Sequence, residues 1–73
     1  MNKKDYLEHI EVNPVKRFGK PCIKGTRITV TDILEMLAHG MSQAEILDEH
    51  PNLQAEQIKA ALIYAANQLP GAA

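Results

Sequence analysis

Residues 31–69 read TDILEMLAHGMSQAEILDEHPNLQAEQIKAALIYAANQL, and the fold depends mainly on this stretch because its apolar residues recur at helical spacing. The pattern predicts helices over about residues 31–39, 42–50 and 54–68. We expect these helices to pack as one compact unit with a shared apolar core. The residues expected to be buried in that core are Ile33, Leu34, Leu37, Ile46, Leu47, Ile58, Ala61, Leu62, Ala65 and Leu69.

Capping residues mark the ends of these predicted helices. Thr29 or Thr31 can cap the start of the first helix, and Gly40 suits the left-handed position that follows its end. Ser42 and Glu45 have the spacing of a capping box at the start of the second helix. The helix boundaries are therefore predicted from local signals alone.

The segment before the helices favours short strands. In EHIEVNP, Ile10 and Val12 alternate with polar residues, and in TRITV, Ile28 and Val30 do the same. Glycines and a proline lie between the two runs, so the connection is a loop or an irregular hairpin. Such short strands are marginal alone and need a helix, or the strands of another chain, to cover them.

The predicted fold class is mainly α: a three-helix, helix-turn-helix-like (homeodomain-like) core preceded by a short β segment or hairpin. We expect a single domain over residues 1–73, with the β and loop segment at about 8–30 and the three-helix core at 31–69. A chain of this size buries only about 60% of its unfolded surface. Pairing of two copies would add buried surface, so a homodimer is expected.

Composition narrows the class of protein. The chain is 45% hydrophobic with a net charge of −1, which is typical of a globular rather than a disordered protein. No apolar run approaches the ~20 residues that cross a bilayer, and MNKKDYLEH lacks the apolar core of a signal peptide. The single cysteine, Cys22, cannot form an internal disulfide. We therefore expect a cytoplasmic protein without a membrane partner.

The charge is unevenly distributed along the chain. Residues 1–27 hold seven bases and three acids, a balance of +4, whereas residues 28–73 hold one base and six acids, a balance of −5. The segment VKRFGKPCIKGTRITV, residues 15–30, has five cations and no acid. This asymmetry indicates an electrostatic partner for one of the two parts of the chain, without identifying that partner.

No set of residues points to catalysis, a metal or a cofactor. His9, His39 and His50 are far apart and lack ligand spacing. GKPCIKGTR differs from the phosphate-binding pattern G-x-x-x-x-G-K-[ST]. Cys22 has a lysine two residues away on either side, which favours a thiolate if they lie close in space; the alternative is a small buried thiol. We expect no enzyme, no metal and no cofactor.

Two parts of the chain are candidates for contact with DNA. The second and third helices, joined by HPNL, have the connection of a helix-turn-helix, and the third helix offers polar side chains near its start, although Glu56 among them would repel phosphates. In the basic segment, six phosphate contacts in a dimer would give a salt slope of about −5. The alternative is that its lysines keep a strand edge soluble. The candidate residues are Lys16, Arg17, Lys20, Lys24, Arg27, Gln54, Gln57 and Lys59.

The sequence GKPCIKGTRITVTDILEMLAHGMSQAEILDEHPNLQAEQIKAALIYAA closely resembles the family catalogued as domain of unknown function 433, over about residues 10–66. The hallmark is a G-K-P-x-I-x-G-T-R-[IV] segment, then a helix, G-M-[ST], an acidic helix, a P-x-L turn and an alanine-rich last helix. The matching positions are Gly19, Lys20, Pro21, Ile23, Gly25, Thr26, Arg27, Gly40, Ser42, Pro51 and Leu53.

The resemblance implies a small prokaryotic protein with a helix-turn-helix-like core, often dimeric. It also implies a VapB-type antitoxin, paired with a PIN-like ribonuclease toxin and repressing their shared operon. Two functional hypotheses follow. The leading hypothesis is a dimeric, non-catalytic, antitoxin-like regulator that binds operator DNA. The competing one is a protein-interaction module that binds an acidic partner, such as the toxin, without contacting DNA.

Overall fold

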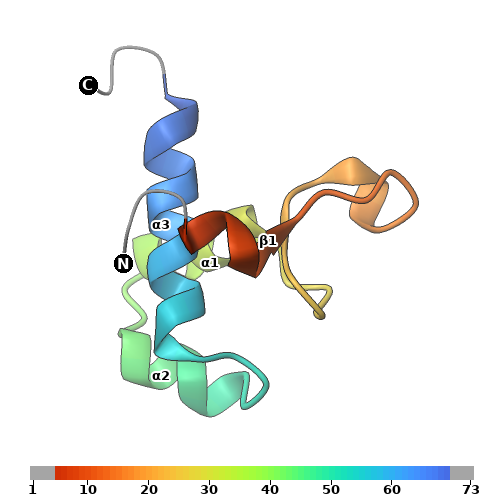
Figure 1. Cartoon of the computed structure of the whole chain (residues 1–73). Helices are drawn as coiled ribbons and strands as arrows, with labels where there is room; N and C mark the ends of the chain where they lie inside the picture. The colour runs from red at the N-terminus through yellow and green to blue at the C-terminus, as the bar shows by residue number, and fades with distance from the viewer. Residues whose placement is uncertain (1–4, 70–73) are drawn as a thin grey trace.

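A computed structural model describes residues 5–69, so the ends of the expected single domain, residues 1–4 and 70–73, lie outside the described part. The chain is mainly helical, with a two-stranded antiparallel hairpin before three helices, as predicted (Figure 1). No helix within residues 5–69 is long and apolar enough to cross a membrane. The elements in chain order are η1 (Asp5–His9), β1 (Ile10–Glu11), η2 (Arg17–Gly19), β2 (Cys22–Ile23), α1 (Val30–Ala38), α2 (Gln43–Glu49) and α3 (Ala55–Gln68).

Reciprocal capping starts helix α1. The Thr29 hydroxyl accepts a hydrogen bond from the Asp32 N–H at 2.9 Å, and the Asp32 carboxylate accepts one from the Thr29 N–H at 3.0 Å. Thr29, rather than Thr31, is therefore the cap. Gly40 follows the helix with φ +94°, the left-handed conformation that was expected there.

Helices α2 and α3 begin at local caps as well. In α2 the Ser42 hydroxyl accepts from the Glu45 N–H at 3.1 Å, and the Glu45 carboxylate accepts from the Ser42 N–H at 3.0 Å, which confirms the predicted capping box. In α3 the Gln57 side-chain oxygen accepts from the Gln54 N–H at 2.9 Å. Each cap satisfies backbone donors that a helix start leaves unpaired.

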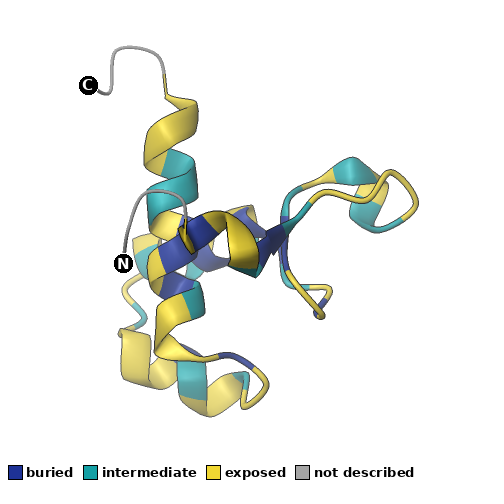
Figure 2. Cartoon of the chain, in the orientation of Figure 1, coloured by how far each residue is buried: buried dark blue, intermediate teal, exposed yellow. Residues whose placement is uncertain are grey.

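One apolar core joins the three helices and the base of the hairpin (Figure 2). Its fully buried members include Ile23, Ile33, Ile46 and Ile58, and each contributes roughly 1.5–3 kcal/mol relative to an exposed side chain. The predicted core residues that are only partly buried pack against its outside; they are Leu34, Leu37, Leu47 and Ala65.

Two residues predicted to be buried on α3 are exposed. Leu62 is 43% exposed and Leu69 is 64% exposed, whereas Ala60 is fully buried. The reason is that η1 packs along α3, which draws a neighbouring face of that helix into the interior. The rings of Tyr6 in η1 and Tyr64 in α3 meet edge to face, with centroids 6.3 Å apart.

The predicted strand over residues 26–30 is wrong. The strand that pairs with β1 is β2, with Ile10 opposite Ile23, and Thr29 forms only an isolated bridge to Cys22. Residues 26–30 instead turn the chain and begin α1, so the residue expected to end a strand, Val30, is the first of the helix. The alternating pattern is compatible both with a strand and with a turn that leads into a helix, because Ile28 and Val30 face the core in either case.

Candidate interaction arm

Residues 10–29, which we call the arm, leave the helical body, make two turns and return to α1 (Figure 1). The outer turn spans residues 13–20 and the inner turn spans residues 24–27. Backbone hydrogen bonds hold the base of the arm: the Ile23 N–H donates to Ile28 O at 2.8 Å, and the Val30 N–H donates to Pro21 O at 2.9 Å. The arm is therefore an ordered projection.

Local hydrogen bonds shape the outer turn. The Asn13 side-chain oxygen accepts from the Val15 N–H at 2.9 Å, and the Asn13 backbone oxygen accepts from the Lys16 N–H at 2.9 Å. The Gly19 N–H donates to Lys16 O at 3.1 Å. These bonds make successive tight turns that present one end of the arm to solvent.

The three residues of η2 have left-handed backbone conformations. Arg17 has φ +51°, Phe18 has φ +59° and Gly19 has φ +79°. This conformation is easy for glycine but costs roughly 1–2 kcal/mol for each other residue. Backbone strain of this kind clusters at functional sites.

Phe18 and Val15 are exposed at the outer turn. Phe18 is 95% exposed and Val15 is 93% exposed, the highest values among the large apolar residues of residues 5–69. The binding residues predicted from the sequence of this segment were all cations and included neither Val15 nor Phe18. The available signal was an apolar residue on each side of Lys16 and Arg17 with no helical or strand periodicity.

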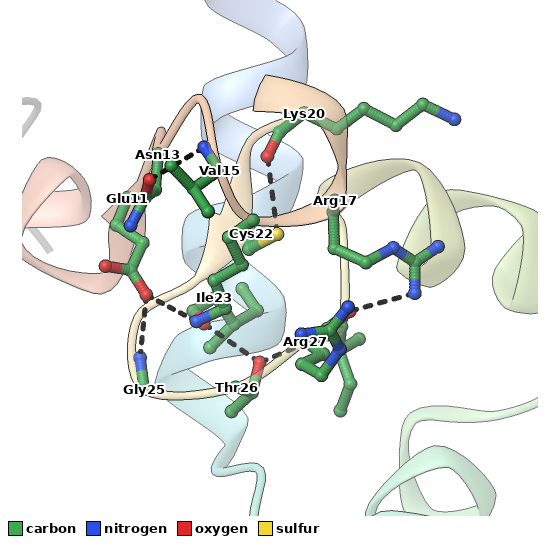
Figure 3. Close-up of polar contacts among 12 residues, drawn as sticks. Glu11, Asn13, Val15, Arg17, Lys20, Cys22, Ile23, Gly25, Thr26 and Arg27 are labelled. Carbon is green, nitrogen blue, oxygen red and sulfur yellow. Dashed lines mark hydrogen bonds and ion pairs between the residues drawn. The ribbon is translucent and has the colours of Figure 1, made fainter.

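One acid outside the basic segment ties the two turns together. The Lys16 Nζ lies 2.7 Å from the Glu11 carboxylate, which also accepts from the Gly25 N–H at 3.3 Å (Figure 3 shows the Glu11–Gly25 contact). The hydrogen bond from Lys16, followed by that from Gly25, lowers the pKa of Glu11 below its ordinary value. Lys16 is therefore partly committed to holding the arm together.

A threonine and a glycine build the inner turn. The buried hydroxyl of Thr26 donates to Ile23 O at 2.9 Å and accepts from the Ile28 N–H at 3.1 Å. Gly25 has φ +80°, a left-handed conformation that glycine adopts without steric strain. These two residues of the family signature therefore shape the arm.

All five cations of the basic segment lie in the arm, three in the outer turn and two in the inner turn. Arg17 donates from Nη1 to Arg27 O at 3.3 Å (Figure 3). Its Nη2 lies 4.0 Å from the Asp32 carboxylate. The side chains of Lys20, Lys24 and Arg27 are exposed and form no ion pair with an acid of residues 5–69. The arm thus combines free positive charge with exposed apolar surface.

The candidate residues of α3 lie elsewhere. Gln54 and Lys59 are exposed near the start of that helix, and Gln57 is half-buried with its side chain in the cap. The start of α3 lies beside α2, while the arm projects from another side of the body (Figure 1). Exposed acids lie on α2 and in the first turn of α3, which opposes phosphate contact on this side of the body; they are Glu45, Asp48, Glu49 and Glu56.

Cys22 is a buried thiol. It is 1% exposed, and its Sγ donates to Lys20 O at 3.3 Å.

No group of three His, Cys, Asp or Glu side chains within residues 5–69 converges in a way that would hold a metal ion. The arm is therefore the feature of the described chain best suited to recognition.

These features define a small three-helix protein with a projecting basic arm. The chain belongs to the family described as "Protein of unknown function (DUF433)", which matches residues 10–65. The match covers the arm and nearly all of the three helices.

Two known proteins are similar to this chain. The uncharacterized protein y4eO of Sinorhizobium fredii (strain NBRC 101917 / NGR234) is 44% identical over 54 residues, which are 73% of this chain and 24% of that protein. The chain thus spans about a quarter of the length of that curated relative. The crystal structure of a DUF433 member protein from Anabaena variabilis ATCC 29413 superposes with a TM-score of 0.77 at 28% identity, covering 92% of this chain and 69% of that one.

Proposed function

We propose that this protein is a non-catalytic binding protein of the antitoxin type, which uses its arm to bind an acidic surface on a PIN-like ribonuclease. The observation that carries the proposal is the outer turn, where Phe18 and Val15 are 95% and 93% exposed among three cations, Lys16, Arg17 and Lys20. We expect the pair to act in the cytoplasm, where a ribonuclease meets its RNA.

The chemistry of the arm favours a protein partner. Burial of an exposed aromatic ring in a pocket stabilises a complex by roughly 25 cal/mol for each Å² of apolar surface, and aromatic and arginine side chains dominate binding energy at interfaces. The turn that presents Phe18 is already ordered, so less conformational entropy is lost on binding. Surrounding cations steer the arm towards an acidic partner.

A ribonuclease offers the complementary surface. An enzyme that uses divalent metal ions to cleave RNA holds those ions with carboxylates. Its active-site cleft is therefore acidic and accommodates an RNA backbone. Lys20, Lys24 and Arg27 would meet the carboxylates while Phe18 enters the cleft, so binding would also block the substrate.

Contact with operator DNA is a second candidate function. It is favoured by three exposed cations that form no ion pair within residues 5–69, namely Lys20, Lys24 and Arg27. Two copies would present six such cations, which corresponds to a salt slope of about −5 in the logarithm of the DNA-binding constant. The acids around the start of α3 make the arm, rather than α3, the expected DNA-contacting surface.

The test is titration of the purified chain into a PIN-like ribonuclease encoded beside it, with calorimetry and RNA cleavage as readouts. We expect binding and inhibition by the wild type, and at least tenfold weaker binding by Phe18→Ser and by Arg27→Glu. The control Lys59→Glu, which changes an exposed lysine away from the arm, should bind normally. Absence of both binding and inhibition by the wild type would refute the antitoxin proposal.

The DNA function has its own test. Fluorescence anisotropy with the chain's upstream DNA and a scrambled duplex, across a salt series, should show sequence-dependent binding that Lys20→Glu weakens. Binding that is absent at low salt, for the chain alone and for its complex with the ribonuclease, would leave only the protein-binding function.

A further inference from the structure

The body of this protein carries a groove that is chemically complementary to its own arm. The groove has a volume of about 430 Å³. Its lining combines apolar, acidic and histidine side chains, namely Ile28, Met36, Met41, Asp32, Glu35, His39 and His50. This volume lies within the range of small-molecule binding pockets, roughly 300–1,000 Å³, so it accommodates an aromatic side chain.

We propose that the arm of one copy docks in this groove of a second copy, and that the contact is reciprocal in a two-fold dimer. The inference goes beyond the proposed function and is tested without it. Because both contacts use Phe18, docking in a second copy and entry into the ribonuclease cleft exclude each other, so the ribonuclease would bind the separated chain. The inference specifies which surfaces meet in the dimer expected from sequence.

Charge complementarity selects a second copy as the occupant. Glu35 in the groove is exposed and forms no ion pair within residues 5–69, and residues 28–73 as a whole carry a balance of −5. In the outer turn, Lys20 is exposed and likewise forms no ion pair within residues 5–69, and it lies two residues from Phe18 in a part of the chain whose balance is +4. Potentials of opposite sign on the two surfaces favour encounter and set the orientation of the copies.

The apolar parts of the two surfaces also match. Phe18 is 95% exposed, so it does not occupy the groove of its own copy. Met36 and Met41 in the groove carry polarizable sulfur atoms, and a sulfur–aromatic contact is worth roughly 0.3–1.5 kcal/mol. The flexible methionine side chains adapt to the shape of an entering ring.

The position of the arm relative to the groove favours a closed dimer. The Arg17 Nη2 lies 4.0 Å from the Asp32 carboxylate of the same copy, which places the outer turn next to the groove. Because the two surfaces adjoin, one two-fold rotation brings each outer turn to the groove of the other copy. The dimer closes with two identical contacts and leaves neither surface open for a third copy.

The test is sedimentation velocity of the full chain over a range of concentrations and salt. We expect a dimer that salt weakens, and a dissociation constant at least about 30-fold higher for Phe18→Ser, the change expected for truncating an aromatic hot spot. Glu35→Lys should also weaken the dimer. Matched controls are Leu7→Ser, which changes a half-exposed leucine away from the arm, and Glu49→Lys, the same charge reversal on α2; both should dimerise normally.

Mixing the two defective variants tests reciprocity. Phe18→Ser keeps an intact groove and Glu35→Lys keeps an intact outer turn, so their mixture recovers one of the two contacts. We expect association in the mixture at concentrations where each variant alone is monomeric. A monomeric wild type, a Phe18→Ser dimer of normal strength, or a mixture no more associated than its components would each overturn the proposal. Ribonuclease binding is measured separately, so its failure leaves this result unaffected.

Discussion

The Lys16 ammonium lies 2.7 Å from the Glu11 carboxylate and joins the outer turn of the arm to β1. The same carboxylate accepts from the Gly25 N–H at 3.3 Å, so one acid connects both turns. The basic segment is therefore not a uniform patch of free charge. Lys16 acts within the arm, whereas Lys20, Lys24 and Arg27 are available to a partner.

Glu11→Gln should loosen the outer turn without unfolding the body. Glutamine retains an oxygen for the Gly25 N–H but removes the charge that attracts Lys16. We expect several-fold faster hydrogen exchange of the Gly19 amide, which bonds to Lys16 O, and little change in the unfolding midpoint. Glu8→Gln, an exposed acid of η1, is the control. Equal exchange in all three proteins would show that the ion pair does not order the turn.

The pH dependence of the arm follows from the lowered pKa of Glu11. Because the pKa of Glu11 in the folded protein lies below its ordinary value of 4.5, the ionised carboxylate stabilises the arm fully above pH 4.5. This stabilisation is lost as the pH falls through the folded pKa. The hydrogen bond from Lys16 is the largest cause. An NMR titration should show the Glu11 pKa rising towards 4.5 in Lys16→Met, while Lys59→Met leaves it unchanged. A Glu11 pKa unaffected by Lys16→Met would contradict this assignment.

Thr29→Ala should destabilise the whole fold. It removes the hydroxyl that accepts from the Asp32 N–H at the start of α1, a loss worth about 1 kcal/mol, up to about 2. Thr29→Ser keeps the hydroxyl and should recover most of the loss. Urea unfolding of the three proteins is the measurement. A serine variant as unstable as the alanine variant would assign the effect to the lost methyl group.

Thr26→Val tests the inner turn. Valine has nearly the shape of threonine but cannot accept from the Ile28 N–H, and leaving such a donor unpaired costs about 1–3 kcal/mol. Ile23 O loses the hydroxyl but keeps its hydrogen bond from the Thr26 N–H at 3.0 Å. Thr26→Ser, which retains both hydrogen bonds, should lose less stability in the same denaturation experiment. The reverse order would mean that packing, rather than hydrogen bonding, explains this residue.

Two substitutions of Phe18 should have the same effect on binding and different effects on the free energy of unfolding. At φ +59° a phenylalanine is strained, whereas asparagine tolerates this conformation. Phe18→Asn should therefore raise the free energy of unfolding by up to about 1 kcal/mol while weakening dimer formation and ribonuclease binding. Phe18→Ala removes the same ring, but alanine is also unfavourable in the left-handed conformation. This variant should therefore bind more weakly without a higher free energy of unfolding. If neither variant binds more weakly, Phe18 is not the anchor of the arm.

Local sequence determined the helices and their beginnings. The caps at Thr29 and at Ser42 with Glu45 connect residues three apart, and Gly40 adopts a conformation that its own lack of a side chain permits. Interactions this short depend little on the rest of the chain, so sequence alone predicts them. The positive charge of the arm is likewise a property of composition.

Tertiary structure decided the pairing and burial of the remaining residues. β1 pairs with Cys22–Ile23 rather than with residues 26–30. On α3, Ala60 is buried and Leu62 is exposed, and η1 packs against this helix. The exposure of Phe18 and the pairing of Arg17 with Asp32 depend on where the arm emerges from the body. These relationships join residues distant in sequence, and only the packed chain brings them within reach of short-range forces.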